Sequence, residues 1–257
     1  MTDETSPLRA AASIIVVRHQ PASAPHFLMI ERAQGMRFAG GAMVFPGGAV
    51  DPADVEHAQL LSPEGDVDDV AARIAAVREA IEEAGLVLGW DGVPPDAARS
   101  LALREALRSG VGLAQAAQAL DLAFDFSSLI PFARWCPPTR VLHKRYDTRF
   151  FLAVVEEVPD WLTPDGGETA RLVWHSARDV LDEADAGRAK IIFPTRRNLE
   201  RLAQYGSVAA LLDHAHSTPV SLISPWIETR DDMEHLCIPE GLGYPVTSEP
   251  LSSAHRG

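Results

Sequence analysis

The chain has 257 residues, of which 46% are hydrophobic and 23% are charged, and its formal net charge is −13. These proportions are typical of a globular protein, and the negative charge argues against non-specific nucleic-acid binding, which needs a basic surface. No apolar stretch approaches the roughly 18 residues of a membrane span. The first residues lack a secretory signal, and Cys136 and Cys237 are the only cysteines, so we expect a cytoplasmic protein without nucleic-acid or membrane partners.

The chain begins with β-structure. Apolar β-branched runs predict strands over residues 12–18 and 26–32, joined as a hairpin, and a short strand over residues 42–45. Pro46, Gly47 and Gly48 then predict a tight turn, at which the backbone comes close to a ligand.

A loop and a long helix are expected next. Residues 51–65 are polar and contain two prolines, which predicts a loop. Acidic residues at 66–69 favour the start of a helix that runs to about Ala84, and Gly85 suits the position after its end. Alanine- and leucine-rich residues 96–120, divided by glycines, predict two short helices that form an inserted hairpin. This hairpin either adds core packing or covers the substrate.

The second half alternates strands and helices. Strands are expected over residues 129–135, 149–155, 171–175 and 220–223, and helices over 177–186, 194–204 and 207–215, with a loop-like tail after 223. The mixed order predicts an α/β (α+β) fold. We expect one domain over residues 1–257, with a core at about 12–200, a helical insertion at about 95–122 and a C-terminal helical extension at about 194–257.

Residues 78–86, Arg-Glu-Ala-Ile-Glu-Glu-Ala-Gly-Leu, carry the clearest chemical signal. On a helix, Glu79, Glu82 and Glu83 fall within an arc of about 100°, opposite an apolar stripe that includes Ile74 and Ile81. Three like charges on one face repel each other, and a hard divalent cation with oxygen ligands would convert that repulsion into binding. The alternative interpretation is a solvated acidic face.

Gly48 and residues 78–86 together resemble the Nudix box, in which a glycine, five residues, a glutamate and seven residues precede R-E-U-x-E-E-x-G-U. The second half matches at every specified position. In the first half, Asp54 stands in place of the glutamate, and 23 residues instead of seven separate it from Arg78. A loop insertion of this length need not move the glutamates. The resemblance implies an α/β/α sandwich with a mixed central sheet, a helical insertion and extra C-terminal helices.

A second pattern resembles the coenzyme A pyrophosphatase branch of that family. It runs from Arg32 through Arg37 and Gly41 to Phe45-Pro46-Gly47-Gly48. This branch begins the pattern with L-L-T-x-R, and Ile30 stands here in place of the threonine. The long box loop, Trp135-x-Pro and residues 146–151 are similar to larger Nudix proteins of the peroxisomal coenzyme A diphosphatase type.

The resemblance implies the following site. Glu79, Glu82 and Glu83 would hold Mg²⁺ or Mn²⁺, the Gly47 carbonyl would add a ligand, and Arg78 would orient the glutamates. Glu168 is the first candidate for a further acid, ahead of Glu156 and Glu157. Arg32, Arg37 and Gly48 are candidates for contacts with the substrate, because guanidinium groups bind phosphate in a bidentate manner.

The implied activity is hydrolysis of a pyrophosphate bond by a Nudix pyrophosphohydrolase. Coenzyme A (CoA) or acyl-CoA is the first substrate considered, and it would give 3′,5′-ADP and phosphopantetheine or its acyl form. One alternative is the same chemistry on ADP-ribose, NADH or a nucleoside triphosphate. The other is a Nudix fold that binds a ligand without turnover. A homodimer is an expectation from the family.

Overall fold

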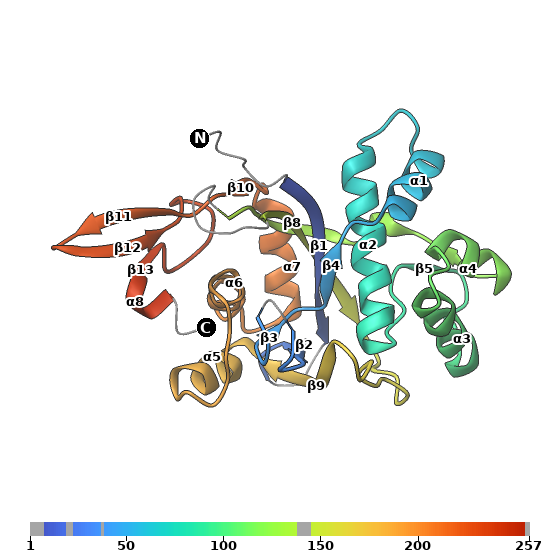
Figure 1. Ribbon diagram of the computed structural model, residues 1–257, viewed down its shortest axis with the longest axis horizontal. Coiled ribbons are helices and arrows are strands. Elements are labelled where there is room, and N and C mark those ends of the chain that lie inside the picture. Colours follow the sequence, from blue (N-terminus) through green and yellow to red (C-terminus); the bar gives the residue numbers. More distant parts are fainter. Residues whose placement is uncertain (1–7, 19–22, 37–38, 138–144, 255–257) are drawn as a thin grey trace.

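A computed structural model describes residues 8–18, 23–36, 39–137 and 145–254, and Figure 1 shows its arrangement. Its strands are β1 (Leu8–Arg18), β2 (His26–Arg32), β3 (Met43–Val44), β4 (Gly47–Ala49), β5 (Trp90–Asp91), β6 (Ala123–Phe124), β7 (Ile130–Trp135), β8 (Arg145–Val155), β9 (Thr169–Ser176), β10 (Leu222–Ile223), β11 (Trp226–Arg230), β12 (Met233–Cys237) and β13 (Ser248–Pro250). Its helices are α1 (Pro52–Leu61), α2 (Val67–Ala84), α3 (Ala97–Arg108), α4 (Leu113–Ala119), α5 (Ala177–Asp185), α6 (Phe193–Leu202), α7 (Val208–Ser217) and α8 (Leu251–Ala254), with a 3₁₀ turn at Phe126–Ser128.

The central sheet is mixed. Its strands follow the order β10-β7-β8-β1-β2-β3, with β4 paired to β1 and β9 paired to β2. Strand β1 runs parallel to β8 along its whole length and pairs antiparallel with β2 at Val17 and Phe27, which confirms the predicted hairpin.

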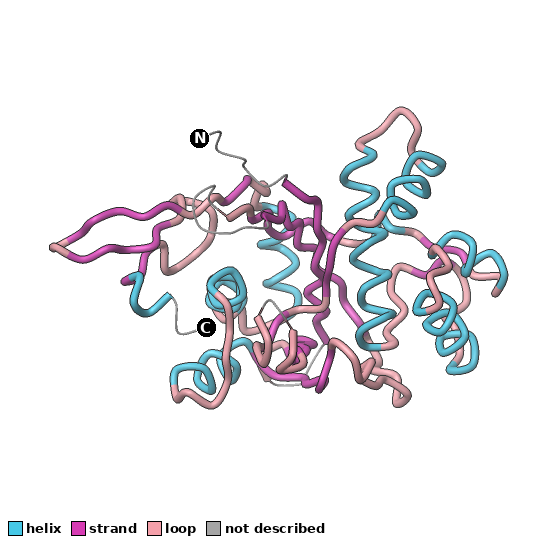
Figure 2. The backbone as a smooth tube through the Cα atoms, in the orientation of Figure 1, coloured by secondary structure: helices cyan, strands magenta, loops and turns pink. Residues whose placement is uncertain are grey.

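Both faces of the sheet are buried, which explains the continuous apolar run of β1. Ile14 and Val16 pack into the core beneath α2, whereas Ile15 and Val17 pack into the core beneath α5, α6 and α7. Figure 2 shows helices on either side of the strands. The expected α/β/α sandwich is therefore confirmed.

The helix α2 begins and ends where the sequence predicts. Asp66 accepts a hydrogen bond from the Asp69 amide at its start, and Gly85 adopts a left-handed conformation, φ 74°, at its end. The structure argues against the alternative interpretation, a solvated acidic face, because Arg78 and Glu83 are both buried. Strand β4 and helix α1 cover that side of α2.

Two sequence expectations are corrected by the structure. Residues 51–65 are not a loop throughout, since they contain helix α1. Pro52 occupies its first turn, and Asp51 and Asp54 form a capping box around it, so the proline starts the helix instead of breaking it. Residues 46–48 do not form a tight turn, because Gly47 and Gly48 belong to β4 and pair with β1.

The tail after residue 223 is not loop-like. Strands β11, β12 and β13 form a separate antiparallel sheet, which projects from the body in Figure 1. Every residue of β11 is exposed, so its sequence carries no alternation of apolar and polar residues that would predict a strand. Within the described residues, no helix combines the length and apolarity that crossing a bilayer would need.

Candidate active site

Arg78 lies at the centre of a buried network of carboxylates on α2 and α1. Its Nη1 donates to Glu79 Oε1 and to Glu82 Oε2, both at 2.8 Å. Its Nε and Nη2 donate to the Asp54 carboxylate at 3.1 to 3.2 Å, and Nη2 also donates to the Ala49 carbonyl at 2.8 Å. One guanidinium therefore fixes two glutamates of α2 and ties them to α1 and β4.

Asp54 has a structural role that the sequence left open. Its side chain is 2% exposed and is neutralised by Arg78. Asp54 lies in the first turn of α1, and the packing of α1 against α2 brings it against Arg78 in spite of the longer separation along the chain. Asp54 thus fixes the position of Arg78, which in turn fixes Glu79 and Glu82 through hydrogen bonds.

Glu83 lies apart from this network and faces the glycine strand. Its Oε2 accepts a hydrogen bond from the Gly47 amide at 2.9 Å. The prediction assigned the Gly47 carbonyl to a metal, whereas the contact seen here uses the Gly47 N–H group. This bond couples the end of α2 directly to β4.

The two glycines of β4 are required by close approach. A Cβ atom on Gly47 would lie 2.7 Å from Ser13 Cα, and one on Gly48 would collide with the carboxylate of Glu79. The sequence predicts close approach of this backbone to a ligand, and the close approach that the structure shows is to the chain's own Ser13 and Glu79.

Burial makes these carboxylates reluctant to ionise. Desolvation raises the pKa of Glu79 to about 7, although the nearby Arg78 lowers it in part. Desolvation also raises the pKa of Glu83 to about 8, with a further increase from the charge of Glu79. The pKa of Glu82 is raised by burial as well, against the attraction of Arg78. Ionising all of these carboxylates would therefore place more negative charge in the site than Arg78 neutralises.

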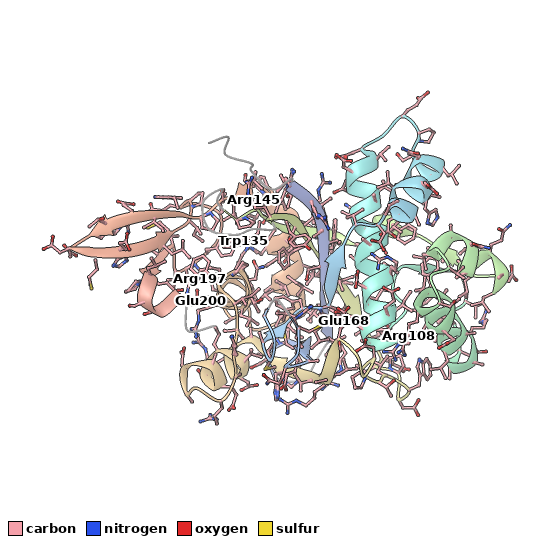
Figure 3. All side chains as sticks on the ribbon, in the orientation of Figure 1. Arg108, Trp135, Arg145, Glu168, Arg197 and Glu200 are labelled. Carbon is pink, nitrogen blue, oxygen red and sulfur yellow. The ribbon has the colours of Figure 1, made fainter. Side chains whose placement is uncertain are left out.

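Arg32 and Glu168 meet at the edge of this group. Pairing of β2 with β9 brings Arg32 opposite Thr169, and Arg32 Nη2 lies 3.7 Å from Glu168 Oε2. Arg32 is half-buried, and its Nε is buried without a hydrogen-bond partner among the described residues. Both residues act electrostatically on Glu83, which places them close to it. Figure 3 shows Glu168 beside the lower part of α2, and Arg37 lies outside the described residues.

The comparisons with known proteins agree with this geometry. The family model described as the NUDT19 Nudix domain matches residues 58–202, which is more than half of the chain. The chain belongs to the Nudix hydrolase family. The resemblance drawn from the box and from the coenzyme A pattern is thereby confirmed, and so is the prediction of an enzyme of the Nudix pyrophosphohydrolase type.

Three related Nudix proteins illustrate the extent of the similarity. Human acyl-coenzyme A diphosphatase NUDT19 is 28% identical over an alignment of 274 residues, which covers 85% of this chain and 72% of the human protein. Putative nudix hydrolase 7 of Caenorhabditis elegans is 30% identical and the alignment covers 78% of this chain, but this chain spans only 62% of that protein. The crystal structure of a NUDIX hydrolase from Alicyclobacillus acidocaldarius superposes with a TM-score of 0.70 at 30% identity, over 81% of this chain and 96% of that one.

The donor set of this Nudix site fits a hydrated divalent ion better than a closed metal cage. Among the described residues, no group of three or more His, Cys, Asp or Glu side chains is arranged to enclose a metal. Mg²⁺ keeps several waters and binds through one or two carboxylates together with substrate phosphates, so it needs no such cage. Glu79 and Glu82 each use one oxygen for Arg78, and the excess of buried acid supplies the charge that a cation would neutralise.

Arg104 is a residue of the site that the sequence did not indicate. It comes from the helical insertion, is buried, and donates from Nε and Nη2 to the carbonyl of Glu82 at 3.0 and 2.9 Å. Nη2 also donates to the carbonyl of Glu83 at 3.2 Å, and Nη1 donates to Thr163. Arg104 thus fixes the last turn of α2, where two of the glutamates lie. No local pattern marks it, because its partners lie more than 20 residues away.

Proposed function

We propose that this Nudix enzyme hydrolyses the pyrophosphate bond of CoA or acyl-CoA with the help of Mg²⁺ or Mn²⁺, giving 3′,5′-ADP and phosphopantetheine or its acyl form. The observation that supports this chemistry is the group of buried carboxylates around Arg78. These carboxylates outnumber the positive side chains beside them. The substrate is supported by the similarity to human acyl-coenzyme A diphosphatase NUDT19 and by the pattern from Arg32 to Gly48.

In this proposal the carboxylates of Glu79, Glu82 and Glu83 hold the ions, with Glu168 and the backbone of Gly47 beside them. Bound divalent ions supply charge neutralisation for the diphosphate and lower the pKa of water. Arg78 keeps Glu79 and Glu82 in place through its two hydrogen bonds.

The remaining residues bind substrate and move the proton. Arg32 has an unsatisfied Nε and only a long ion pair with Glu168, so its guanidinium is available to grip a phosphate oxygen. Gly48 leaves room beside Glu79 because it has no side chain. Glu79, or an acid next to it, accepts the proton of the attacking water, and its raised pKa of about 7 suits a base at neutral pH. Arg37 remains a proposed phosphate contact on the basis of sequence.

The expectations about domain organisation, cellular location and oligomeric state also remain proposals. We retain a single domain, with the insertion at about 95–122 carried on the Nudix core, a cytoplasmic location and a homodimer. The free cysteines Cys136 and Cys237 are compatible with a reducing compartment.

A substrate panel tests the proposed function. The purified chain would be incubated with Mg²⁺ or Mn²⁺ and CoA, acyl-CoA, ADP-ribose, NADH and nucleoside triphosphates, and the products separated by chromatography. We expect the highest kcat/KM for CoA or its esters, with release of 3′,5′-ADP. Better turnover of ADP-ribose or NADH would keep the chemistry and reject the substrate. No turnover of any of them would favour a ligand-binding module.

A further inference from the structure

A second site lies on the other side of the sheet from α2. A cavity of about 900 Å³ opens between the β2–β3 hairpin, the connection from α5 to α6 and the first turn of α6. Its walls include Met43 and Ile191, which belong to the core beneath α5, α6 and α7. None of the three box glutamates lines it. Its size is within the range of about 300–1,000 Å³ found for small-molecule sites.

The lining holds four basic and three acidic side chains, although the protein as a whole is strongly acidic. The four cations are Arg171, Arg188, Lys190 and Arg196. Within the described part of the chain, the Lys190 side chain has no ion-pair or hydrogen-bond partner. This concentration of positive charge opposes the field of a chain with net charge −13, as an anionic ligand would require.

The three arginines are held in ion pairs that a ligand could replace. Arg171 pairs with Glu31 at 3.0 Å, and Arg196 pairs with Asp185 at 2.8 Å. Arg188 pairs with Glu183, which lies outside the lining. In each pair one side chain is more than 60% exposed. Such exposed pairs contribute little to stability.

The third acid of the lining, Glu249, is already neutralised. The buried guanidinium of Arg197 donates to Glu249 at 3.1 Å. Lys190 therefore gives the cavity an excess of positive charge that none of its acids offsets.

The start of α6 borders the same cavity, and its first turn includes Pro194, which has no N–H group. Its N-cap residue is Ile192, which has no side-chain oxygen, so no side chain caps the first turn. Phe193 and Arg196, from that turn, line the cavity. Unfilled amides at a helix start favour an anion. Phe193, Met43 and Ile191 also offer apolar surface for a ring.

We propose that this cavity binds a phosphomonoester carried on a nucleotide-sized group, with Lys190 and Arg196 as its main contacts. Two sources share this chemistry. One is the 3′-phosphate of the CoA substrate, and this version rests on the proposed function. The other is a separate nucleotide that binds without being cleaved. The β2–β3 hairpin links the cavity to the active site, because Glu31 lines the cavity and Arg32 faces Glu168.

Calorimetry in EDTA tests the site without catalysis. Adenosine 3′,5′-bisphosphate, inorganic phosphate and adenosine would be titrated into the full chain, its Lys190→Met and Lys190→Arg variants, and an Arg99→Met control. Arg99 lies on α3, on the opposite side of the molecule in Figure 1. We expect the bisphosphate to bind, Lys190→Met to weaken it about tenfold, Lys190→Arg to restore most of the affinity, and Arg99→Met to leave it unchanged.

The site is rejected if the bisphosphate does not bind in EDTA, or if Lys190→Met and Arg196→Met both leave its affinity unchanged. Kinetics with Mg²⁺ then separate the sources. A higher KM for CoA but not for 3′-dephospho-CoA in Lys190→Met identifies the phosphate of the substrate. Unchanged KM values for both, with weakened bisphosphate binding, identify a separate ligand. If the wild-type chain hydrolyses neither, the proposed function fails, while the titration in EDTA still decides this site.

Discussion

Two buried arginines gather carboxylates in this chain, and the charge around them differs. Arg78 on α2 contacts Asp54, Glu79 and Glu82, while Glu83 lies next to this group. Arg197 on α6 is 1% exposed and forms ion pairs with Glu200 and Glu249, the second of which belongs to β13. In Figure 3, Arg197 and Glu200 lie together at α6, on the other side of the sheet from α2.

The number of acids around each arginine distinguishes a structural ion pair from a site that needs a cation. At α6, Arg197 is balanced by two acids, with Arg196 nearby, and the group fastens the C-terminal strand to the core. At α2, one arginine faces several acids, two of which have pKa values raised to about 7 and about 8. A raised pKa alone does not separate the groups, because that of Glu200 is raised to about 7 as well. The acids outnumber the arginine by more at α2, and we therefore propose the α2 group as the one that binds metal ions.

The largest expected effect is on catalysis. Glu82→Gln should lower kcat by about 10³-fold, equivalent to about 4 kcal/mol, because it removes a carboxylate that would hold a metal ion. Glu249→Gln, the matched change at the α6 group, should leave kcat within about threefold of wild type. Steady-state kinetics on the preferred substrate measures both, with circular dichroism to confirm folding. Equal losses in the two variants would contradict the assignment of the site to α2.

The two arginines should have similar effects on stability and different effects on activity. Arg78→Met and Arg197→Met should each lower the free energy of unfolding by about 3–5 kcal/mol, since each leaves buried carboxylates unpaired. Urea denaturation measures this loss, and Arg99→Met on the surface of α3 is the control, with an expected change below about 0.5 kcal/mol. The folded fraction of Arg197→Met should keep its kcat, whereas that of Arg78→Met should not.

Metal ions should stabilise only one of the two groups. Mg²⁺ or Mn²⁺ at about 100 times its Kd should raise the free energy of unfolding by about 2.7 kcal/mol, and EDTA should reverse the increase. Thermal unfolding with and without the ion measures it. Glu83→Gln should reduce the shift, while Glu200→Gln should retain it. A shift of the same size in Glu83→Gln would remove that residue from the set of ligands.

The smallest expected effect is a pH dependence from the α6 group. Burial raises the pKa of Glu200 from 4.5 to about 7, against the attraction of Arg197. Because this pKa is higher in the folded state, the folded state binds the proton more tightly, and stability falls as pH rises from about 4.5 to about 7. Glu200→Gln should therefore reduce that slope. Glu79 and Glu83 give slopes of the same sign, so the slope of the wild type alone does not report Glu200. The quantity to measure is the difference in slope between the wild type and Glu200→Gln. Parallel slopes would mean that Glu200 has an ordinary pKa.

The elements that could be predicted from the sequence are those with a local cause. The strand at residues 26–32 matches β2, and the glycines at 110 and 112 separate α3 from α4 as expected. Helix α1 is not predicted, because prolines and polar residues favour a loop over 51–65, although Asp51 and Asp54 carry a capping signal. The strands β11 to β13 were missed because their residues are too exposed to show a period.

The sequence by itself determined the three glutamates and their common arc on one helix, because spacing along a helix fixes these relations. The motif to which they belong gave the resemblance to the Nudix family. Only the tertiary structure decided what surrounds them. Asp54 reaches Arg78 through α1, Arg104 reaches α2 from the insertion, and Glu168 reaches Arg32 through the pairing of β2 with β9. These contacts join residues 24, 22 and 136 positions apart, and no local pattern encodes them, since they depend on how separate elements pack.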